Sequence, residues 1–314
     1  MRTQMGKHES VREQAGVARS TTVLVSCARL HTERVGQGPA LVLVPGGGGD
    51  AGMFEDVVPL LAERFTVITY DRRGNSRSPL ADPAARIDVP QQADDVIAIL
   101  DHYGIDQAYV FGNSGGAIIA LELLAHHSGR LLGAVVHEPP LMQVLPLDSP
   151  ERQAMEDIER LGRDKGPLRA SAAFGAMTLP QPPRMFVSPR GQALIAATSR
   201  VMLATAGAAK RVTGREPDTM TRILGNSRIL IERELSEFCF AYQPDLDALR
   251  NVGIPWRLAT GRDSEGRPYH RPAHVLSELL GVACEEFPGG HTVYQQRPRE
   301  FTQRLITILD QLSS

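Results

Sequence analysis

The 314-residue sequence has few cysteines, no long apolar run and no excess of charge of either sign. Its cysteines, Cys27, Cys239 and Cys284, lie far apart and show no C-x-x-C spacing, which argues against a disulfide framework and a zinc site. The net charge of −2 gives no electrostatic reason to expect nucleic acid or an anionic membrane surface as a partner. We therefore expect a cytoplasmic protein that acts on a small molecule without a metal. The oligomeric state stays open, with a homodimer as one option.

The overall composition is that of an ordinary globular protein. Apolar residues make up 42% of the chain and charged residues 22%, which is enough to bury a sizeable core and disfavours both disorder and membrane spanning. The length fits one α/β domain with an insertion. Residues 1–20 are polar and lack a hydrophobic stripe, so we expect a flexible N-terminal arm there.

Short apolar runs alternate with segments of helical spacing over most of the chain. The pattern predicts a strand pair within 22–35 and single strands at 40–45, 65–71, 107–112, 131–138, 255–261 and 283–287. It predicts helices at 53–64, 90–104, 117–127, 270–281 and 299–312. Such alternation is typical of a mostly parallel, doubly wound α/β sheet with helices on both faces.

The alternation is interrupted between residues 139 and 243. Long helix-like segments replace it there, separated by clusters of proline and glycine such as LPQPPR. We therefore predict a helical cap insert at 139–243 and a core domain formed by 21–138 and 244–314.

Two glycine-rich loops compete as the functional centre. The first, GGGDAG at 47–52, fits the G-x-G-x-x-G pattern of a dinucleotide-binding turn, and Asp71 follows at the end of the next predicted strand. Four consecutive glycines match many patterns by chance, however, and two strand-like segments already precede this loop. A phosphate-binding Walker loop is excluded because no lysine with a following serine or threonine comes after the glycines.

The second loop, Gly112-Asn113-Ser114-Gly115-Gly116, matches G-x-S-x-G between a predicted strand and a predicted helix. A sharp turn at this point would expose the Ser114 hydroxyl as a nucleophile, and small neighbours would let strand and helix approach. The alternative is that Ser114 simply caps the helix, because serine is a preferred N-cap residue.

A serine nucleophile needs a base, and the base needs an acid. His291 lies in FPGGHTVY between the last predicted strand and the last helix, where a glycine loop can present its imidazole at the edge of the sheet. Asp263, after the strand at 255–261, is slightly preferred as the acid. Glu138, at the end of the strand at 131–138, remains an alternative, and either carboxylate can instead be structural.

Over residues 22–312 the sequence resembles the α/β-hydrolase superfamily. The landmarks are LVLVPGGGG, YDRRGNSRS, GNSGG, the helical insert, GRDSEG and PGGHTVY. The resemblance implies an oxyanion hole formed by the backbone N–H groups of Gly47 and Gly115. It also implies a cofactor-independent serine hydrolase of the esterase or lactonase type, acting on a small, largely apolar molecule.

Two other classes of function stay open at this point. One is a small-molecule binding protein, or a cyclase-like enzyme, on the same scaffold, because one fold supports many chemistries. The other is the NAD(P)-dependent oxidoreductase that the first glycine loop suggests.

Overall fold

The computed structural model describes residues 19–179 and 181–313. Most of the predicted flexible arm (1–20) therefore lies outside the described residues, and its last two residues begin the first strand. Within these ranges no helix is both long and apolar enough to cross a membrane.

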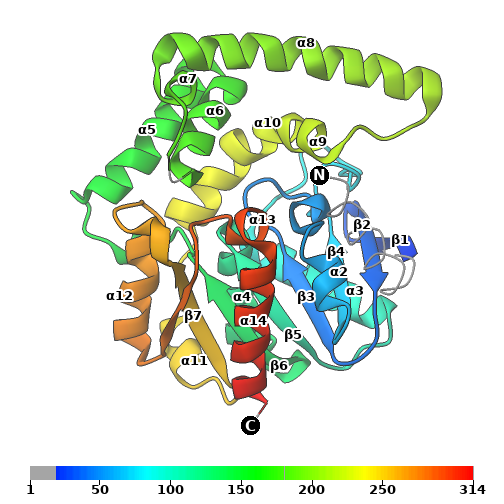
Figure 1. Ribbon diagram of the computed structural model, residues 1–314, viewed down its shortest axis with the longest axis vertical. Coiled ribbons are helices and arrows are strands. Elements are labelled where there is room, and N and C mark those ends of the chain that lie inside the picture. The colour runs from blue at the N-terminus through cyan, green and yellow to red at the C-terminus, as the bar shows by residue number, and fades with distance from the viewer. Residues whose placement is uncertain (1–18, 180, 314) are drawn as a thin grey trace, which may run out of the picture.

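The core of the molecule is one eight-stranded sheet with the strand order β1-β2-β4-β3-β5-β6-β7-β8 (Figure 1). The first two pairs, β1 with β2 and β2 with β4, are antiparallel, and every later pair is parallel. This confirms the predicted mostly parallel α/β sheet. The strands are β1 (Arg19–Val25), β2 (Ala28–Val35), β3 (Ala40–Val44), β4 (Thr66–Tyr70), β5 (Ala108–Asn113), β6 (Leu131–His137), β7 (Trp256–Gly261) and β8 (Cys284–Phe287).

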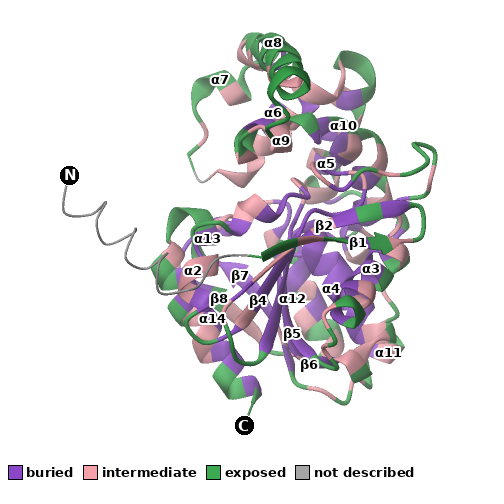
Figure 2. Cartoon of the chain, turned by 90° about the vertical axis from the view of Figure 1, so that its right-hand side faces the viewer, coloured by how far each residue is buried: buried purple, intermediate pink, exposed green. Residues whose placement is uncertain are grey.

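The central strands are apolar on both faces because helices cover both sides of the sheet. In β3, Leu41 and Leu43 point to one face and Val42 and Val44 to the other, as the two-residue period of a strand requires. Figure 2 shows this buried sheet between two layers of helices. One layer contains α3 (Val89–His102), α4 (Gly115–His126), α11 (Leu246–Arg250) and α12 (His270–Leu280); the other contains η1 (Ala51–Phe54), α2 (Val58–Leu61), α13 (Val293–Gln296) and α14 (Pro298–Leu312).

One predicted helix is divided in the structure. The segment 53–64 forms the short helices η1 and α2 instead of one continuous helix. The reason is Pro59, which would lie inside a continuous helix, where it lacks an N–H and clashes with the preceding turn. In the structure it takes one of the first two positions of α2, where neither problem arises.

Between β6 and β7 the described chain passes mainly through helices, which lie above the carboxyl ends of the parallel strands (Figure 1). We refer to these segments, from η3 to η5, as the cap helices. The longest, α8, is largely exposed (Figure 2). They are η3 (Met142–Val144), α5 (Pro150–Lys165), α6 (Pro167–Thr178), α7 (Arg184–Val187), α8 (Pro189–Thr213), α9 (Thr219–Gly225), α10 (Ser227–Ile229) and the π-helical η4 (Leu230–Glu234) and η5 (Glu237–Ala241).

The two remaining short helices are η2 (Ser128–Arg130), before β6, and η6 (Arg262–Ser264), after β7. Because β3, β5, β6, β7 and β8 run parallel, the loops that follow them leave the sheet at the same edge. Every predicted site residue lies in, or next to, one of these loops.

Candidate active site

Ser114 forms a strained turn between β5 and α4. Its backbone has φ 56° and ψ −120°, a left-handed conformation that is rare for a residue with a side chain. The residue takes the N-cap position of α4, but its side chain makes no capping hydrogen bond. The alternative interpretation of Ser114 as a side-chain cap therefore has no support in the geometry, and strain of this kind is typical of functional sites.

Two glycines make this turn possible. A Cβ atom on Gly116 would lie 2.2 Å from the carbonyl oxygen of Val44, and a Cβ atom on Gly112 would lie 2.3 Å from the carbonyl oxygen of Gly116. Backbone atoms would have to move at either position if any side chain were added. The glycines of the motif thus allow α4 to start directly against the end of β3, with Ser114 at the junction.

His291 lies in the loop after β8 and is almost fully buried, with 3% of its surface exposed. Its Nδ1 lies 2.6 Å from Oε2 of Glu138. An ionised carboxylate can only accept a hydrogen bond, so Nδ1 carries a proton here and Nε2 is the ring nitrogen not engaged with the acid. The ring of Tyr269 packs against the imidazole with 3.8 Å between centroids and a tilt of 30°, and the Tyr269 hydroxyl donates to the carbonyl of Met177 on α6.

Glu138 follows the last residue of β6 and has φ 50°, a second left-handed backbone. This conformation points its carboxylate inward, where the N–H of Gly261 donates to Oε1 at 2.7 Å. Burial alone would raise the pKa of Glu138, but His137 and His291 outweigh burial and lower that pKa to about 2. Glu138 is therefore ionised at neutral pH and is suited to hold a histidine in one tautomer.

Asp263 does not approach His291. Its side chain is 41% exposed and its nearest charged partner is Arg297, at 3.8 Å. The backbone N–H of Asp263 donates to the carbonyl of Gly289, which fixes this part of the loop while the carboxylate faces outward. The sequence-based preference for Asp263 over Glu138 is thus not supported by the geometry.

The loops that carry Ser114 and His291 are joined through β6 and α13. The Ser114 N–H donates to the backbone carbonyl of His137. The imidazole rings of His137 and His291 lie 6.4 Å apart between centroids. The Asn113 amide nitrogen donates to the hydroxyl of Tyr294, three residues after His291. Within the described ranges, no hydrogen bond joins the Ser114 hydroxyl to His291 directly.

His137 is a buried, neutral histidine beside these groups. Its Nδ1 lies 2.6 Å from the amide oxygen of Asn113, which can only accept, so Nδ1 is protonated. Its Nε2 is buried and has no partner among the described residues. Burial lowers the pKa of His137 from 6.5 to about 4, since a charged imidazole would lose its hydration there.

This pKa predicts a pH-dependent loss of stability. As the pH falls from 6.5 to about 4, the unfolded chain takes up a proton at His137 before the folded protein does, which favours unfolding by up to about 3 kcal/mol. We expect His137→Gln, which keeps a donor for Asn113, to flatten this part of the stability profile relative to wild type. Urea unfolding at several pH values measures the difference.

The same substitution at the exposed His102 is the control for loss of a histidine. Glu138 acts in a separate window: its contribution is present above pH 4.5 and is lost as the pH falls toward 2. If the free energy of unfolding changed equally with pH in wild type and His137→Gln between pH 6.5 and 4, the assignment of a neutral buried His137 would be contradicted.

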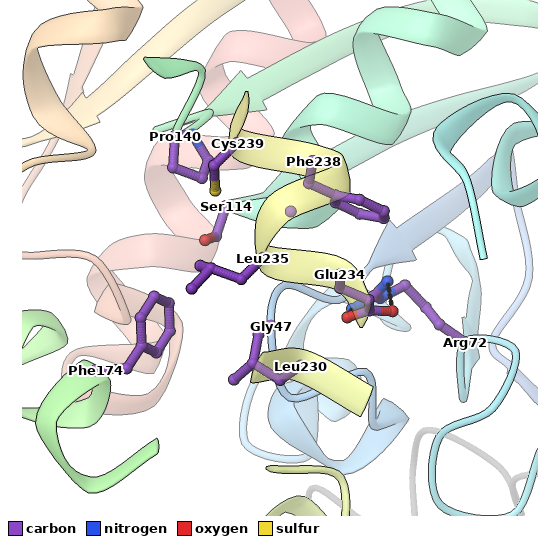
Figure 3. Close-up of a pocket in the computed structure, with 11 residues that line it drawn as sticks. Gly47, Arg72, Ser114, Pro140, Phe174, Leu230, Glu234, Leu235, Phe238 and Cys239 are labelled. Atoms are coloured by element: carbon purple, nitrogen blue, oxygen red, sulfur yellow. Dashed lines mark hydrogen bonds and ion pairs between the residues drawn. The ribbon is translucent and has the colours of Figure 1, made fainter. Parts of the chain in front are cut away.

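Ser114 lines a small, partly enclosed pocket between the sheet edge and the cap helices (Figure 3). Gly47 and Gly115 lie on its wall, and within the described part of the chain neither backbone N–H is used in another hydrogen bond. Both donors are therefore free for an oxygen of a bound molecule. The other lining residues are mostly apolar: Arg72, Pro140, Phe174, Leu230, Glu234, Leu235, Phe238 and Cys239.

Three residues near this site were not found from the sequence. Tyr269 and His137 belong to no motif, and Glu234 comes from a cap helix with no signal beyond a charge in an apolar segment. All three are buried, at 5%, 0% and 2% exposure. A buried polar residue is informative only once burial is known, so the structure was needed to find them.

The geometry around the first glycine loop does not favour a dinucleotide site. The Asp71 carboxylate is fully buried and accepts hydrogen bonds from the N–H of Ala51 and from the backbone and side chain of Arg77. It is therefore engaged within the protein instead of being available to a ribose. Among the described residues, no group of three or more His, Cys, Asp or Glu side chains is arranged to hold a metal ion.

Comparisons with known proteins agree with this architecture. A family model described as the alpha/beta hydrolase fold matches residues 39–230. The uncharacterized hydrolase YraK of Bacillus subtilis (strain 168) is 34% identical over 296 residues, which cover 92% of this chain and 95% of that protein. A zearalenone hydrolase of Bionectria ochroleuca is 38% identical over 125 residues, which cover 39% of this chain and 47% of that protein.

The crystal structure of the enol-lactonase from Burkholderia xenovorans LB400 has a TM-score of 0.64 and 19% identity, and the match covers 92% of this chain and all of that one. At this level of identity the likeness concerns the fold alone.

Proposed function

Because this chain belongs to the α/β-hydrolase fold family, we propose that it is a serine hydrolase with the triad Ser114, His291 and Glu138. It acts on an ester or lactone bond of a small, largely apolar molecule. The observation that carries the proposal is the buried contact of 2.6 Å between His291 Nδ1 and Glu138, at the same sheet edge as the strained Ser114 turn. That contact holds Nδ1 on the acid and leaves Nε2 as the ring nitrogen that can serve as the general base.

In the proposed reaction, Ser114 Oγ attacks the carbonyl carbon and His291 Nε2 takes the hydroxyl proton. Ionised Glu138 stabilises the imidazolium that forms. The carbonyl oxygen becomes negative and accepts hydrogen bonds from the free N–H groups of Gly47 and Gly115. One donor of this type typically lowers the barrier by about 3 to 4 kcal/mol.

The tetrahedral intermediate then collapses. The bond to the leaving oxygen breaks, His291 returns its proton to that oxygen, and an acyl-enzyme remains on Ser114. Water repeats the sequence, with His291 as the base, and releases the acid. In a lactone the leaving oxygen stays attached to the acyl group, so the product is a single hydroxy acid.

The pocket lining supports an apolar substrate. Phe174, Leu230 and Leu235 face the space in front of the Ser114 hydroxyl (Figure 3). Arg72 and Glu234, the charged residues of the lining, hydrogen-bond to each other at 2.7 Å and are each neutralised by that contact. An uncharged acyl chain or ring matches such a wall better than a charged group does. The partly matching curated relative is named a zearalenone hydrolase, which makes zearalenone a reasonable member of a substrate panel.

Fluorophosphonate labelling tests the proposal. We expect covalent labelling of the folded protein at Ser114, localised by peptide mass mapping, and hydrolysis of at least one member of a panel of p-nitrophenyl esters and lactones. Heat-denatured protein is the control for non-specific labelling. A folded protein that stays unlabelled at Ser114 would contradict the triad. Labelling without turnover of any panel member would favour a binding protein or a non-hydrolytic enzyme.

A further inference from the structure

A buried ion pair connects the cap to the wall of the pocket. Arg72 follows β4 and Glu234 ends the π-helical segment η4, and their side chains are 1% and 2% exposed. Both guanidinium Nη atoms donate to the two carboxylate oxygens at 2.7 Å (Figure 3). The pair is thus a bidentate contact between two almost fully buried side chains.

Arg72 also reaches the backbone of the proposed oxyanion hole. Its Nη2 donates to the carbonyl oxygen of Gly46 at 2.9 Å. The Gly46 carbonyl and the Gly47 N–H belong to one planar peptide unit, so a contact that holds the oxygen also fixes the direction of the N–H. A cationic donor on the oxygen further polarises the unit and strengthens the N–H as a donor.

The ring of Phe238 lies between the Arg72 guanidinium and Gly115, the second proposed oxyanion donor. The Arg72 guanidinium carbon is 5.5 Å from the centroid of Phe238, and the edge of this ring packs against Gly115. A side chain on Gly115 would meet Phe238 at 3.2 Å. Arg72 therefore contacts the Gly46–Gly47 peptide directly and Gly115 indirectly through Phe238, and a substrate carbonyl oxygen would lie between these two donors.

Stability alone does not account for this arrangement. Removing two charges from water costs free energy, and a buried ion pair can often be replaced by apolar residues of similar volume without loss of stability. Glu234 also accepts a 3.4 Å hydrogen bond from Asn75, and Gln92 accepts one from Arg72, so four polar side chains converge here. Such a network fixes one orientation of the guanidinium.

We propose that Arg72 is a positioning residue for the oxyanion hole, aligning and polarising the Gly46–Gly47 peptide, and that Glu234 of the cap holds its guanidinium in place. This inference rests on the proposed hydrolase function. It predicts that the ion pair affects the transition state more strongly than substrate binding, because the negative oxygen appears only during the reaction.

The test is the double variant Arg72→Met/Glu234→Leu, which removes both charges and keeps apolar volume. With p-nitrophenyl butyrate as the probe, we expect kcat to fall about 10- to 50-fold, part of the loss that follows removal of a whole donor, while KM changes less than threefold. The inhibition constant of phenylboronic acid, which forms a tetrahedral adduct on serine, should rise by a similar factor. A purely structural role would not separate kcat and boronate affinity from KM.

A matched control removes the neighbouring buried pair, Arg73 and Asp95, which are 1% and 2% exposed and do not touch Gly46. Arg73→Met/Asp95→Leu should keep kcat within about threefold of wild type. An Arg72→Met/Glu234→Leu variant with unchanged kcat would overturn the inference while leaving the hydrolase proposal intact. A wild type that neither labels at Ser114 nor hydrolyses the ester overturns both.

If the double variant does not fold, Arg72→Lys gives the answer. Lysine keeps a positive charge for Glu234 but lacks the planar fork that serves Glu234 and Gly46 together. We expect kcat to fall at least about fivefold with KM unchanged, a fraction of the effect of one oxyanion donor. An unchanged kcat in this variant overturns the inference.

Discussion

Ser114→Ala is expected to lower kcat for p-nitrophenyl butyrate by about 10⁴- to 10⁶-fold, because the substitution removes the proposed nucleophile. His291→Ala should cause a loss of similar size, since a serine hydroxyl without its base is a poor nucleophile at neutral pH. Ser114→Ala/His291→Ala should have nearly the same kcat as either single variant, because the effects of residues that act together in one step are not additive. Steady-state kinetics of the three proteins, with melting temperatures to confirm folding, gives the comparison.

His274→Ala is the control, because His274 lies exposed on α12. It should keep kcat close to that of wild type. If Ser114→Ala and His291→Ala each lost only a few-fold, or if their losses multiplied in the double variant, the two side chains would not act as a unit.

The second large effect is expected at Glu138. Glu138→Gln should lower kcat by about 10³- to 10⁴-fold, because a neutral amide can donate to His291 Nδ1 and favour the wrong tautomer, and it cannot stabilise the imidazolium. Asp263→Asn should change kcat less than about twofold, because its exposed carboxylate faces Arg297 and solvent. The ratio of the two effects, measured with the same ester, identifies the acid.

Glu138→Gln must fold for this comparison to hold, since Glu138 also accepts from the Gly261 N–H. Urea unfolding of each variant at pH 7 therefore accompanies the kinetics. A large loss in Asp263→Asn together with a small one in Glu138→Gln would assign the acid to the loop after β7, against the geometry described above.

Strands β3 to β7 could be predicted from the sequence because each is a short, largely apolar run that is almost entirely buried. The predicted runs at 40–45 and 255–261, for example, correspond to β3 (Ala40–Val44) and β7 (Trp256–Gly261) with a shift of one residue at one end. The prediction of one helix at 53–64 is wrong because Pro59 cannot lie inside a continuous helix, even where the apolar residues have helical spacing.

Ser114 and His291 could be proposed from the sequence because each lies in a short glycine-rich motif, whose glycines allow a sharp turn that presents the side chain at the edge of the sheet. The choice of acid could not be made in the same way. Glu138 and Asp263 both follow sheet strands, and what separates them is the backbone: Glu138 has φ 50°, which directs its carboxylate to His291, 153 residues later in the chain. No local pattern specifies that turn.

The contact between Arg72 and Glu234 was beyond sequence reasoning for a similar reason. The two residues are 162 positions apart in the chain, and they meet only because the η4 segment packs against the loop after β4. Charged residues in helices usually face solvent, so their letters alone give no signal of burial.

With Glu138 at the end of β6 as the proposed acid, the loop after β7 carries no reacting group. Arg262, Asp263 and Glu265 all lie exposed in that loop. Such a loop can change in length or sequence during evolution without loss of the proposed activity, provided that Tyr269 still contacts the His291 imidazole. Under the proposed triad, the loop after β7 can therefore vary in sequence beside His291, whereas the position of Glu138 at the end of β6 cannot.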